Sequence, residues 1–307
     1  MKKLMFPAAL FLVFALILSL FAAANAADGA PIAKNLEIST YRGVSVGGRL
    51  GATDPEGDKL TFEITTEPIK GKLDLDQNGH FVYTPENGKR GKDYFGYKAI
   101  DPDGNRSQEA TVIIRIQKQE SKITYADLSG ESSAQAAVRL AEEGVFVGEC
   151  LAGEYVFSPD APVTRSEFLA MCMKVAGTQP ISGVRTTGFA DDADISVWAK
   201  PYVSTALKYG IISGYPDEGE TCAVFGPDQL ISVTEAAVIL DRAVELTDAA
   251  ATWYDCDAAV PTWAVQSVAN VSSCALLPDG CSFADDTLSR GCAAELLCGA
   301  MDLLANR

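Results

Sequence analysis

Apolar and polar residues alternate with a period of two along the first third of the chain. The alternation forms three apolar rows: Leu60, Phe62 and Ile64; Phe95, Tyr97 and Ala99; and Val112, Ile114 and Ile116. The turns between these rows, such as DPEGD, DQNGH and DPDGN, are rich in Asp, Asn, Pro and Gly. Strands with one buried face that are joined by such turns are typical of a small antiparallel β-sandwich. We therefore expect an all-β antiparallel sandwich over residues 28–118.

A helical pattern replaces the alternation after a polar segment, residues 119–124, which we interpret as a linker between domains. Residues 189–244 predict a helix, a Gly/Pro/Asp loop, a short turn and a second helix. An aromatic residue, with an Asp two residues later, recurs at positions 125, 189 and 253, a spacing of 64 residues. Three similar units predict a repeat array. We name these units repeat 1 (residues 125–177), repeat 2 (188–246) and repeat 3 (252–305).

The first helix of repeat 2 is expected to carry an aromatic face. In repeat 2, Trp198, Tyr202, Ala206 and Tyr209 share one helical face, and Gly210 supplies a left-handed stop. Trp263 stands at the matching position of repeat 3, and repeat 1 has Ser132 there. The tryptophans either belong to the core or contact a ligand. A second set of aromatic residues is expected to pack the loop onto the helix pair: Phe157, Phe225 and Phe283.

The second helices begin with the sequences TRSE, SVTE and SRGC. A hydroxyl residue followed three residues later by Glu predicts a capping box at the start of the first two. Arg165 and Arg290 fall at the first helical position, where the positive end of the helix dipole disfavours a cation. An arginine at a helix N-terminus indicates an anion site, because both the dipole and the guanidinium attract negative charge.

The N-terminus has the pattern of an export signal. Two lysines precede an apolar run that ends in Ala24-Asn25-Ala26, so residues 1–26 predict a signal peptide that is cut after Ala26. An uncleaved membrane anchor is the alternative, because the run approaches the length that spans a bilayer. After cleavage we expect a protein outside the cytoplasm that makes no membrane contact.

The chain is acidic, with a formal net charge of −16. This charge argues against nucleic-acid binding, and an anionic ligand would have to be held by local cations. All eight cysteines lie between Cys150 and Cys298, and an exported segment with an even count favours disulfides, such as a loop-to-helix bridge between Cys150 and Cys172. The pairing stays open. The chain has one histidine and no GxSxG, HExxH or P-loop motif, so we expect no enzyme activity and no cofactor.

Calcium is a possible exception to the absence of cofactors. Oxygen ligands for a hard cation cluster in two turns of the sandwich: Asp54, Glu56 and Asp58, and Asp101, Asp103 and Asn105. The candidates are Asp54, Asp58, Asp101 and Asp103. The alternative is plain turn chemistry, in which Asp bonds neighbouring backbone and Pro and Gly set its conformation.

Two resemblances add to these predictions. The segment from VGGRLGATDPEGD to DPDGN resembles the bacterial cadherin-like, immunoglobulin-like modules of surface proteins, which serve as spacers or adhesive units. The pattern FADDADISVWA, GIISGY and FGPDQLISVTEA resembles the S-layer homology (SLH) module, and the three copies resemble an SLH triplet. This second resemblance implies an all-α, three-lobed pseudo-trimer whose grooves bind secondary cell-wall polysaccharide, often pyruvylated.

The SLH resemblance also implies site residues. The Arg of the second-helix motif, the Trp of the first helix and the loop Gly correspond to these residues: Arg165, Arg290, Trp198, Trp263 and Gly214. Tyr215 either stacks on a sugar ring or covers the loop. Val233 replaces the Arg in repeat 2, and Cys292 replaces the Glu in repeat 3. At most two grooves therefore keep the anion-binding Arg.

The leading hypothesis is a secreted cell-surface protein that attaches non-covalently to wall polysaccharide and displays the sandwich as a spacer or adhesive module. The alternative is a set of degenerate, disulfide-stapled repeats that serve as a protein-interaction or S-layer lattice domain without glycan binding. A third hypothesis is a calcium-dependent adhesin. Other surface proteins are further candidate partners.

Overall fold

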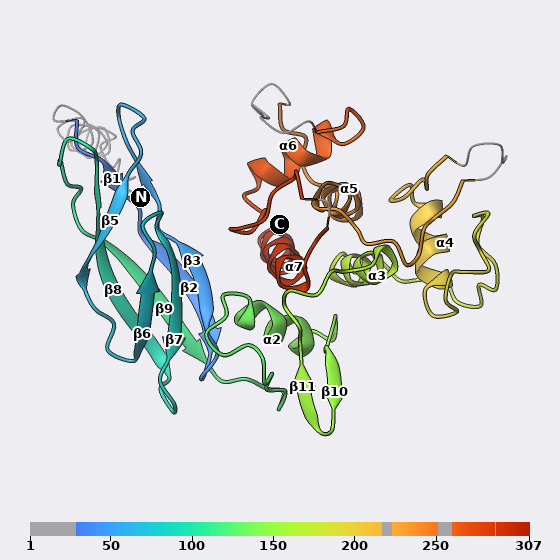
Figure 1. Ribbon diagram of the computed structural model, residues 1–307, viewed down its shortest axis with the longest axis horizontal. Helices are drawn as coiled ribbons and strands as arrows, with labels where there is room; N and C mark the ends of the chain where they lie inside the picture. Colours follow the sequence, from blue (N-terminus) through green and yellow to red (C-terminus); the bar gives the residue numbers. More distant parts are fainter. Residues whose placement is uncertain (1–28, 217–222, 251–259, 286) are drawn as a thin grey trace, which may run out of the picture. The chain divides into compact units, whose positions relative to one another are not determined.

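The computed structural model describes residues 29–216, 223–250, 260–285 and 287–307, and it divides into two compact units (Figure 1). The first unit ends at Lys118, and the second runs from Gln119 to Arg307 together with the short segment Val44–Val46. The predicted signal peptide, residues 1–26, lies outside the described residues. Among the residues that are described, no helix has the length and apolar character needed to cross a membrane.

The first unit holds two β-sheets. Four strands in the order β2-β9-β8-β5 form one sheet, and three in the order β3-β7-β6 form the other. Their bounds are β2 Leu36–Tyr41, β3 Val46–Arg49, β5 Thr61–Thr66, β6 Gly71–Leu75, β7 His80–Pro85, β8 Gly91–Ile100 and β9 Ala110–Gln117. A short antiparallel pair, β1 (Ile32–Ala33) with β4 (Ala52–Thr53), lies beside them.

One strand pair departs from the predicted antiparallel arrangement. The pairs β5/β8, β8/β9 and β6/β7 are antiparallel, but β2 runs parallel to β9, with Leu36 opposite Val112. A parallel pair needs a long connection, and everything from β3 to β8 lies between these two strands. Alternation with a period of two occurs in both kinds of sheet, so the sequence pattern could not reveal this direction.

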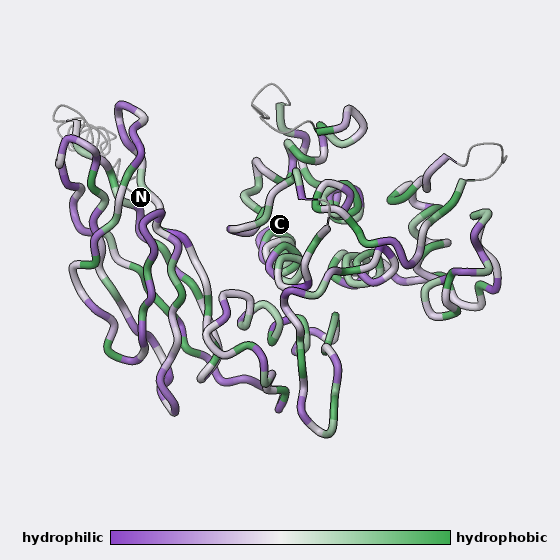
Figure 2. Tube along the Cα trace, viewed as in Figure 1, coloured by the Kyte–Doolittle hydropathy of each residue, from purple (hydrophilic) through white to green (hydrophobic). Residues whose placement is uncertain are grey.

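The alternating rows of β8 and β9 form the core of the sandwich. Phe95, Tyr97 and Val112 are fully buried, and Tyr83 of the facing sheet donates a 2.8 Å hydrogen bond to the buried Asp93. On the edge strand β5, Phe62 is only partly buried. Figure 2 shows hydrophilic and hydrophobic stretches along the strands of this unit, and hydrophilic stretches at several of the turns between them. The predicted apolar rows of β8 and β9, which have a neighbouring strand on both sides, are therefore confirmed as buried, whereas the row of the edge strand β5 is only partly buried.

The second unit is mainly helical. Its helices are α2 Ala134–Glu142, α3 Arg165–Val175, α4 Lys200–Lys208, α5 Val233–Val244, α6 Val265–Ser273 and α7 Arg290–Ala305. Repeat 1 also contains a hairpin, β10 (Glu149–Leu151) with β11 (Glu154–Val156), so the expectation of an all-α array is wrong there. Ala152 and Gly153 both have positive φ, 52° and 92°, as the commonest two-residue hairpin turn requires. Ala-Gly lacks the Asn or Asp that usually marks this turn.

The second helices of the repeats, α3, α5 and α7, lie together in the middle of the helical unit, with α2, α4 and α6 outside them (Figure 1). Helix α3 contacts both α5 and α7, while α4 packs on α3, α6 on α5 and α2 on α7. Each first helix thus packs on the second helix of another repeat. The two predicted capping boxes are confirmed, at Thr164/Glu167 and Ser232/Glu235.

The segments that lead into α3, α5 and α7 form a closed cycle of backbone hydrogen bonds. The N–H of Ile231 donates to the carbonyl of Val163 at 3.0 Å, that of Leu288 to Ile231 at 2.8 Å, and that of Val163 to Leu288 at 3.0 Å. Each of these residues stands two positions before its helix begins and is almost fully buried. Three equivalent positions therefore meet at one place in the core.

The aromatic residue before each second helix packs the loop inward, as predicted. Phe157 and Phe225 are fully buried, and Phe283 is nearly so. The recurring Asp holds this packing: Asp191 accepts hydrogen bonds from the backbone N–H groups of Phe225 and Gly226 at 2.8 and 2.7 Å. Asp127 does the same for Phe157. The aromatic-x-Asp motif of repeats 1 and 2 is therefore structural.

The cysteine pairing only partly follows the prediction. A loop-to-helix disulfide joins Cys281 to Cys292 of α7 in repeat 3. Cys150 and Cys172 are free thiols, so the expected bridge between them is wrong. Cys150 is exposed on β10, whereas Cys172 is fully buried in α3, where burial raises the pKa of its thiol. Cys222 and Cys256 lie outside the described residues.

Candidate functional site

Arg165 is the first residue of α3, as predicted, but the N-terminus of that helix is not an open anion site. The backbone N–H of Arg165 donates to the carbonyl of Gln229 at 2.8 Å, and that of Ser166 donates to Pro227 at 3.1 Å. Carbonyls of repeat 2 therefore satisfy N–H groups that a helix leaves unpaired. The start of α7 is closed in the same way, because the N–H of Arg290 donates to Ala161 of repeat 1 at 2.8 Å. Any anion binding must come from the side chains.

The side chain of Arg165 is buried between repeats 1 and 2. One of its terminal nitrogens, Nη1, donates to the hydroxyl of Tyr215 at 2.9 Å and lies 3.8 Å from Oε1 of Glu235. The guanidinium carbon is 4.6 Å from the centre of the Tyr215 ring and 5.5 Å from that of Phe225, within cation–π range. Only 7% of the residue is exposed, and its Nε has no hydrogen-bond partner among the described residues.

Tyr215 links the two charged groups. Its hydroxyl donates to Glu235 while it accepts from Arg165. Burial, together with the hydrogen bond to Glu235, raises the pKa of Tyr215 to about 12, so the phenol keeps its proton at neutral pH. The loop holds the residue through backbone hydrogen bonds in both directions with Val224, at 2.8 and 3.0 Å. Gly214 precedes it with φ of +76°, a conformation that favours glycine.

A pocket of about 320 Å³ opens beside this cluster. It is lined by Arg165 of α3, the loop residues 211–216, the α5 residues Glu235, Val238, Ile239 and Arg242, and Trp263 of repeat 3. Four of the residues proposed from the sequence thus lie around one pocket: Arg165, Gly214, Tyr215 and Trp263. Arg290 and Trp198 are not part of its lining.

Two charged residues of the pocket, Glu235 and Arg242, are not among the site residues predicted from the sequence. With Val238 and Ile239 they occupy positions i, i+3, i+4 and i+7 of α5, so they share one helical face. Glu235 had been assigned to the capping box alone. The spacing in SVTEAAVILDR could have shown that Arg242 stands on the same face two turns later.

The two tryptophans are exposed, so the hypothesis that they belong to the core is wrong. Trp198 is 51% exposed and Trp263 is 55% exposed. Each precedes the first helix of its repeat rather than lying inside it. Of the proposed aromatic face in repeat 2, only Ala206 is fully buried, and Tyr209 is 65% exposed. An exposed indole beside a pocket is available to a ligand.

Arg290 has a different environment from Arg165. Its Nη1 donates to the backbone carbonyl of Phe157 at 2.7 Å, and its guanidinium carbon lies 5.3 Å from the centre of the Phe146 ring. These contacts attach the side chain to repeat 1.

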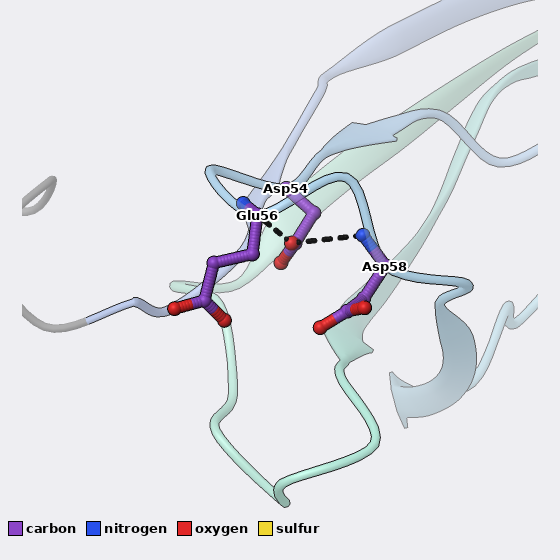
Figure 3. Close-up of side chains that lie close together, drawn as sticks. All are labelled: Asp54, Glu56 and Asp58. Carbon is purple, nitrogen blue, oxygen red and sulfur yellow. Dashed lines mark hydrogen bonds between the residues drawn. The ribbon is translucent and has the colours of Figure 1, made fainter.

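The structure divides the calcium candidates of the sandwich. One oxygen each from Asp54, Glu56 and Asp58 lies within 4.8 Å of the others, and Figure 3 shows the three side chains around one loop. Oδ1 of Asp54 accepts from the backbone N–H of Glu56 at 2.9 Å and from that of Asp58 at 3.1 Å, so this oxygen already serves the turn. Three carboxylates within this distance fit a hard cation in donor type.

Asp101 instead has a structural role. It accepts hydrogen bonds of 2.8 Å from both the backbone and the side-chain amide of Asn105. Burial alone would raise the pKa of Asp101, but these hydrogen bonds hold it below the ordinary value. Asp103 is exposed on the same turn and is not part of the acidic group around Asp54.

Family models match both units. The one described as "Bacterial cadherin-like domain" matches residues 28–118, and the one described as "S-layer homology domain" matches residues 188–237. The chain carries a bacterial cadherin-like domain followed by an SLH domain. The SLH match covers most of repeat 2, which includes Gly214, Tyr215 and the first turn of α5.

Curated relatives match part of the chain's length. A "Cellulosome-anchoring protein" of Acetivibrio thermocellus is 30% identical over 127 residues, which are 41% of this chain and 27% of that protein. A "Surface-layer 125 kDa protein" of Lysinibacillus sphaericus is 26% identical over 151 residues, 47% of this chain and 12% of that protein. "Exoglucanase XynX" of A. thermocellus is 34% identical over 85 residues, 27% of this chain and 7% of that enzyme. The chain thus spans about a quarter or less of the length of these relatives.

Where repeat 2 meets repeat 3, other residues replace the contacts of Arg165, Tyr215 and Glu235. Val233 stands at the first position of α5, where α3 has Arg165, and it is buried. Cys292, at the position of Glu235, is joined to the loop residue Cys281. A covalent loop-to-helix link therefore occupies the place where Tyr215 bonds Glu235 in repeat 2.

Proposed function

We propose that the SLH repeats bind an anionic secondary cell-wall polysaccharide in the pocket beside Arg165, and that this contact anchors the secreted protein to the bacterial cell wall. The observation that carries the proposal is the pocket of about 320 Å³ that joins a buried arginine, a second arginine and an exposed tryptophan. A small number of fixed polar groups in an otherwise apolar cleft is the usual composition of a ligand site.

The lining suits a sugar that carries a carboxylate. Trp263 offers an exposed flat face for the apolar side of a pyranose ring, and Tyr215 lines the same pocket. Guanidinium groups match the planar geometry of a carboxylate. The two arginines and the glutamate of the lining give the pocket a net charge of +1, whereas the whole chain carries −16, so the attraction of an anion has to be short-ranged.

We propose further that the three repeats form a three-lobed pseudo-trimer. The hydrogen-bonded cycle of Val163, Ile231 and Leu288 supports it, as does the packing of each first helix on another repeat's second helix. In this arrangement Arg290 and Trp198 would contribute a secondary contact from the equivalent groove. The proposed domain limits are residues 28–118 for the cadherin-like module, 119–124 for the linker, and 125–177, 188–246 and 252–305 for the repeats.

The cadherin-like module is proposed to project from the wall as a non-catalytic spacer or adhesive unit. The named relatives that anchor or form surface layers support a location on the cell surface. A protein-interaction or lattice role is a second candidate function. The groove between repeats 2 and 3 favours it, because Val233 replaces the Arg there and the disulfide Cys281–Cys292 replaces the Glu.

Co-sedimentation with cell-wall sacculi tests the anchoring proposal. The protein is expected to pellet with intact sacculi and to remain in the supernatant once the attached polysaccharide has been stripped. Trp263→Ala should reduce pelleting more than Trp198→Ala, which removes a similarly exposed tryptophan from the secondary groove, because only Trp263 lines the pocket. Pelleting that survives the stripping would refute glycan anchoring and favour the protein-interaction role.

A further inference from the structure

The charge of Arg165 is largely committed inside the protein. Its guanidinium is stacked against two aromatic rings, donates to Tyr215 and lies 3.8 Å from Glu235, whose side chain is only 18% exposed. A carboxylate at this distance neutralises much of the field of the arginine in a poorly solvated place. Arg165 therefore shapes the pocket and leaves it little net charge.

Arg242 is the remaining charged residue of the lining. It lies in the last turn of α5, two helical turns after Glu235 and on the same face. Its side chain is exposed, and within the described part of the chain neither an ion pair nor a hydrogen bond engages it. The three charged groups of the lining give a net charge of +1, and this surplus comes from Arg242.

The equivalent positions of the other repeats do not offer such a cation. Arg242 is the tenth residue of α5, and the tenth residues of α3 and α7 are Lys174 and Gly299. The amine of Lys174 donates to the carbonyls of Gly144 and Val145 at 3.3 and 3.2 Å, so it is held by its own repeat. Gly299 has no side chain. Among the tenth residues of these three helices, Arg242 is thus the cation whose side chain no other described residue binds.

We propose that Arg242 is the specificity-determining residue of the pocket: it engages the carboxylate of the bound sugar, while Arg165 positions the loop and the aromatic wall. This inference rests on the proposed polysaccharide binding and names the residue that makes it selective for an acidic ligand. An exposed guanidinium that bonds a carboxylate forms a charge-assisted hydrogen bond, which is stronger than a neutral one.

The test compares binding of purified wall polysaccharide in two forms, with its carboxylates intact and with the carboxylates reduced to alcohols after carbodiimide activation. The whole protein without its signal peptide is used, and affinity is measured by calorimetry. The wild type is expected to prefer the intact form. Arg242→Gln should lose about tenfold in affinity for the intact form, the equivalent of about 1.4 kcal/mol, and bind the reduced form unchanged. Arg242→Lys should recover part of the loss, because the charge returns without the planar fork.

Arg185→Gln is the matched control, since it removes the same charge from an exposed arginine that does not line the pocket. It should behave as the wild type. If Arg242→Gln and Arg185→Gln are indistinguishable while the wild type binds, the role of Arg242 is refuted and the anchoring proposal stands. If the wild type binds neither form, the anchoring proposal fails, and the inference fails with it. Equal thermal melting temperatures of the variants would show that any loss is not a folding defect.

Discussion

Gly210 and Gly214 allow the packing of the repeat 2 loop to be tested with a matched pair of substitutions. Both have a left-handed backbone, with φ of +72° and +76°; Gly210 precedes the loop that lines the pocket, and Gly214 is part of that loop. A Cβ at Gly210 would have no atom within 4 Å. A Cβ at Gly214 would collide with the ring of Phe189 and lie 2.7 Å from the carbonyl oxygen of Val224. The two positions share the conformational cost of alanine and differ in the space available.

The magnitudes follow from this difference. An alanine in the left-handed region costs about 1–2 kcal/mol, and the lower entropy of its unfolded chain offsets about 0.4–1 kcal/mol. Gly210→Ala should therefore lower the free energy of unfolding by about 1 kcal/mol. Gly214→Ala adds an overpacking cost of about 1–3 kcal/mol, because Phe189 is buried and the other close atom is backbone. It should also weaken polysaccharide binding, since Tyr215 is the next residue.

Urea denaturation of the two variants and the wild type, followed by circular dichroism, measures these free energies. We expect Gly214→Ala to be less stable than Gly210→Ala by about 1–3 kcal/mol. Equal losses would mean that the loop can move away from Phe189, and would refute the claim that the pocket wall is fixed by close packing.

Arg165→Met should destabilise the protein by about 1–3 kcal/mol, because it leaves the carboxylate of Glu235 without its cation. In urea denaturation, adding Glu235→Gln should recover most of that loss, and purely additive effects of the two substitutions would contradict the pairing. The ion pair of Asp192 with Lys200, at 2.7 Å, is the first cause that lowers the pKa of Asp192, from 3.8 to about 2. The stabilisation from this ion pair is present above the unfolded pKa of Asp192 and is lost as the pH falls from about 4 to about 2. Asp192→Asn should therefore flatten the acid limb of a curve of stability against pH. An unchanged acid limb would refute the contribution of the ion pair. Ala275, with φ of 52°, stands at the left-handed helix stop of repeat 3, which Gly210 forms in repeat 2. Ala275→Gly should therefore raise stability by about 0.5–1 kcal/mol in thermal melting. A lower melting temperature would show instead that the methyl group of Ala275 packs against the protein.

Local signals in the sequence predicted most of the helical unit. The capping boxes and the glycine stop each depend on contacts within a few positions, and both are present. The inward-facing Phe residues were also predicted, because the aromatic-x-Asp pattern that holds them recurs along the chain. The parallel pairing of β2 with β9 and the β10–β11 hairpin were missed. Strand direction depends on the whole chain path, and the turn of the hairpin uses Ala-Gly rather than a strong turn signal.

The candidate site was predicted in part for a related reason. Arg165 stands out because its position at a helix start is locally unfavourable, but its partners Tyr215 and Glu235 lie 50 and 70 residues away in the sequence. The sequence predicts the same anion-binding role for Arg290, which also begins a second helix. In the structure, however, its side chain contacts Phe157 and Phe146. Which arginine faces a pocket depends on how the repeats pack on one another. No single repeat contains that information.

A titration of tryptophan indole N–H resonances with purified wall polysaccharide tests the central claim most directly. Trp263→Phe and Trp198→Phe variants assign the two signals. The proposed site predicts a saturable shift of the Trp263 signal at polysaccharide concentrations that leave the Trp198 signal in place, because only Trp263 lines the pocket with Arg165 and Arg242. A shift of Trp198 alone, or binding that moves neither signal, would contradict the claim that this pocket holds the polysaccharide.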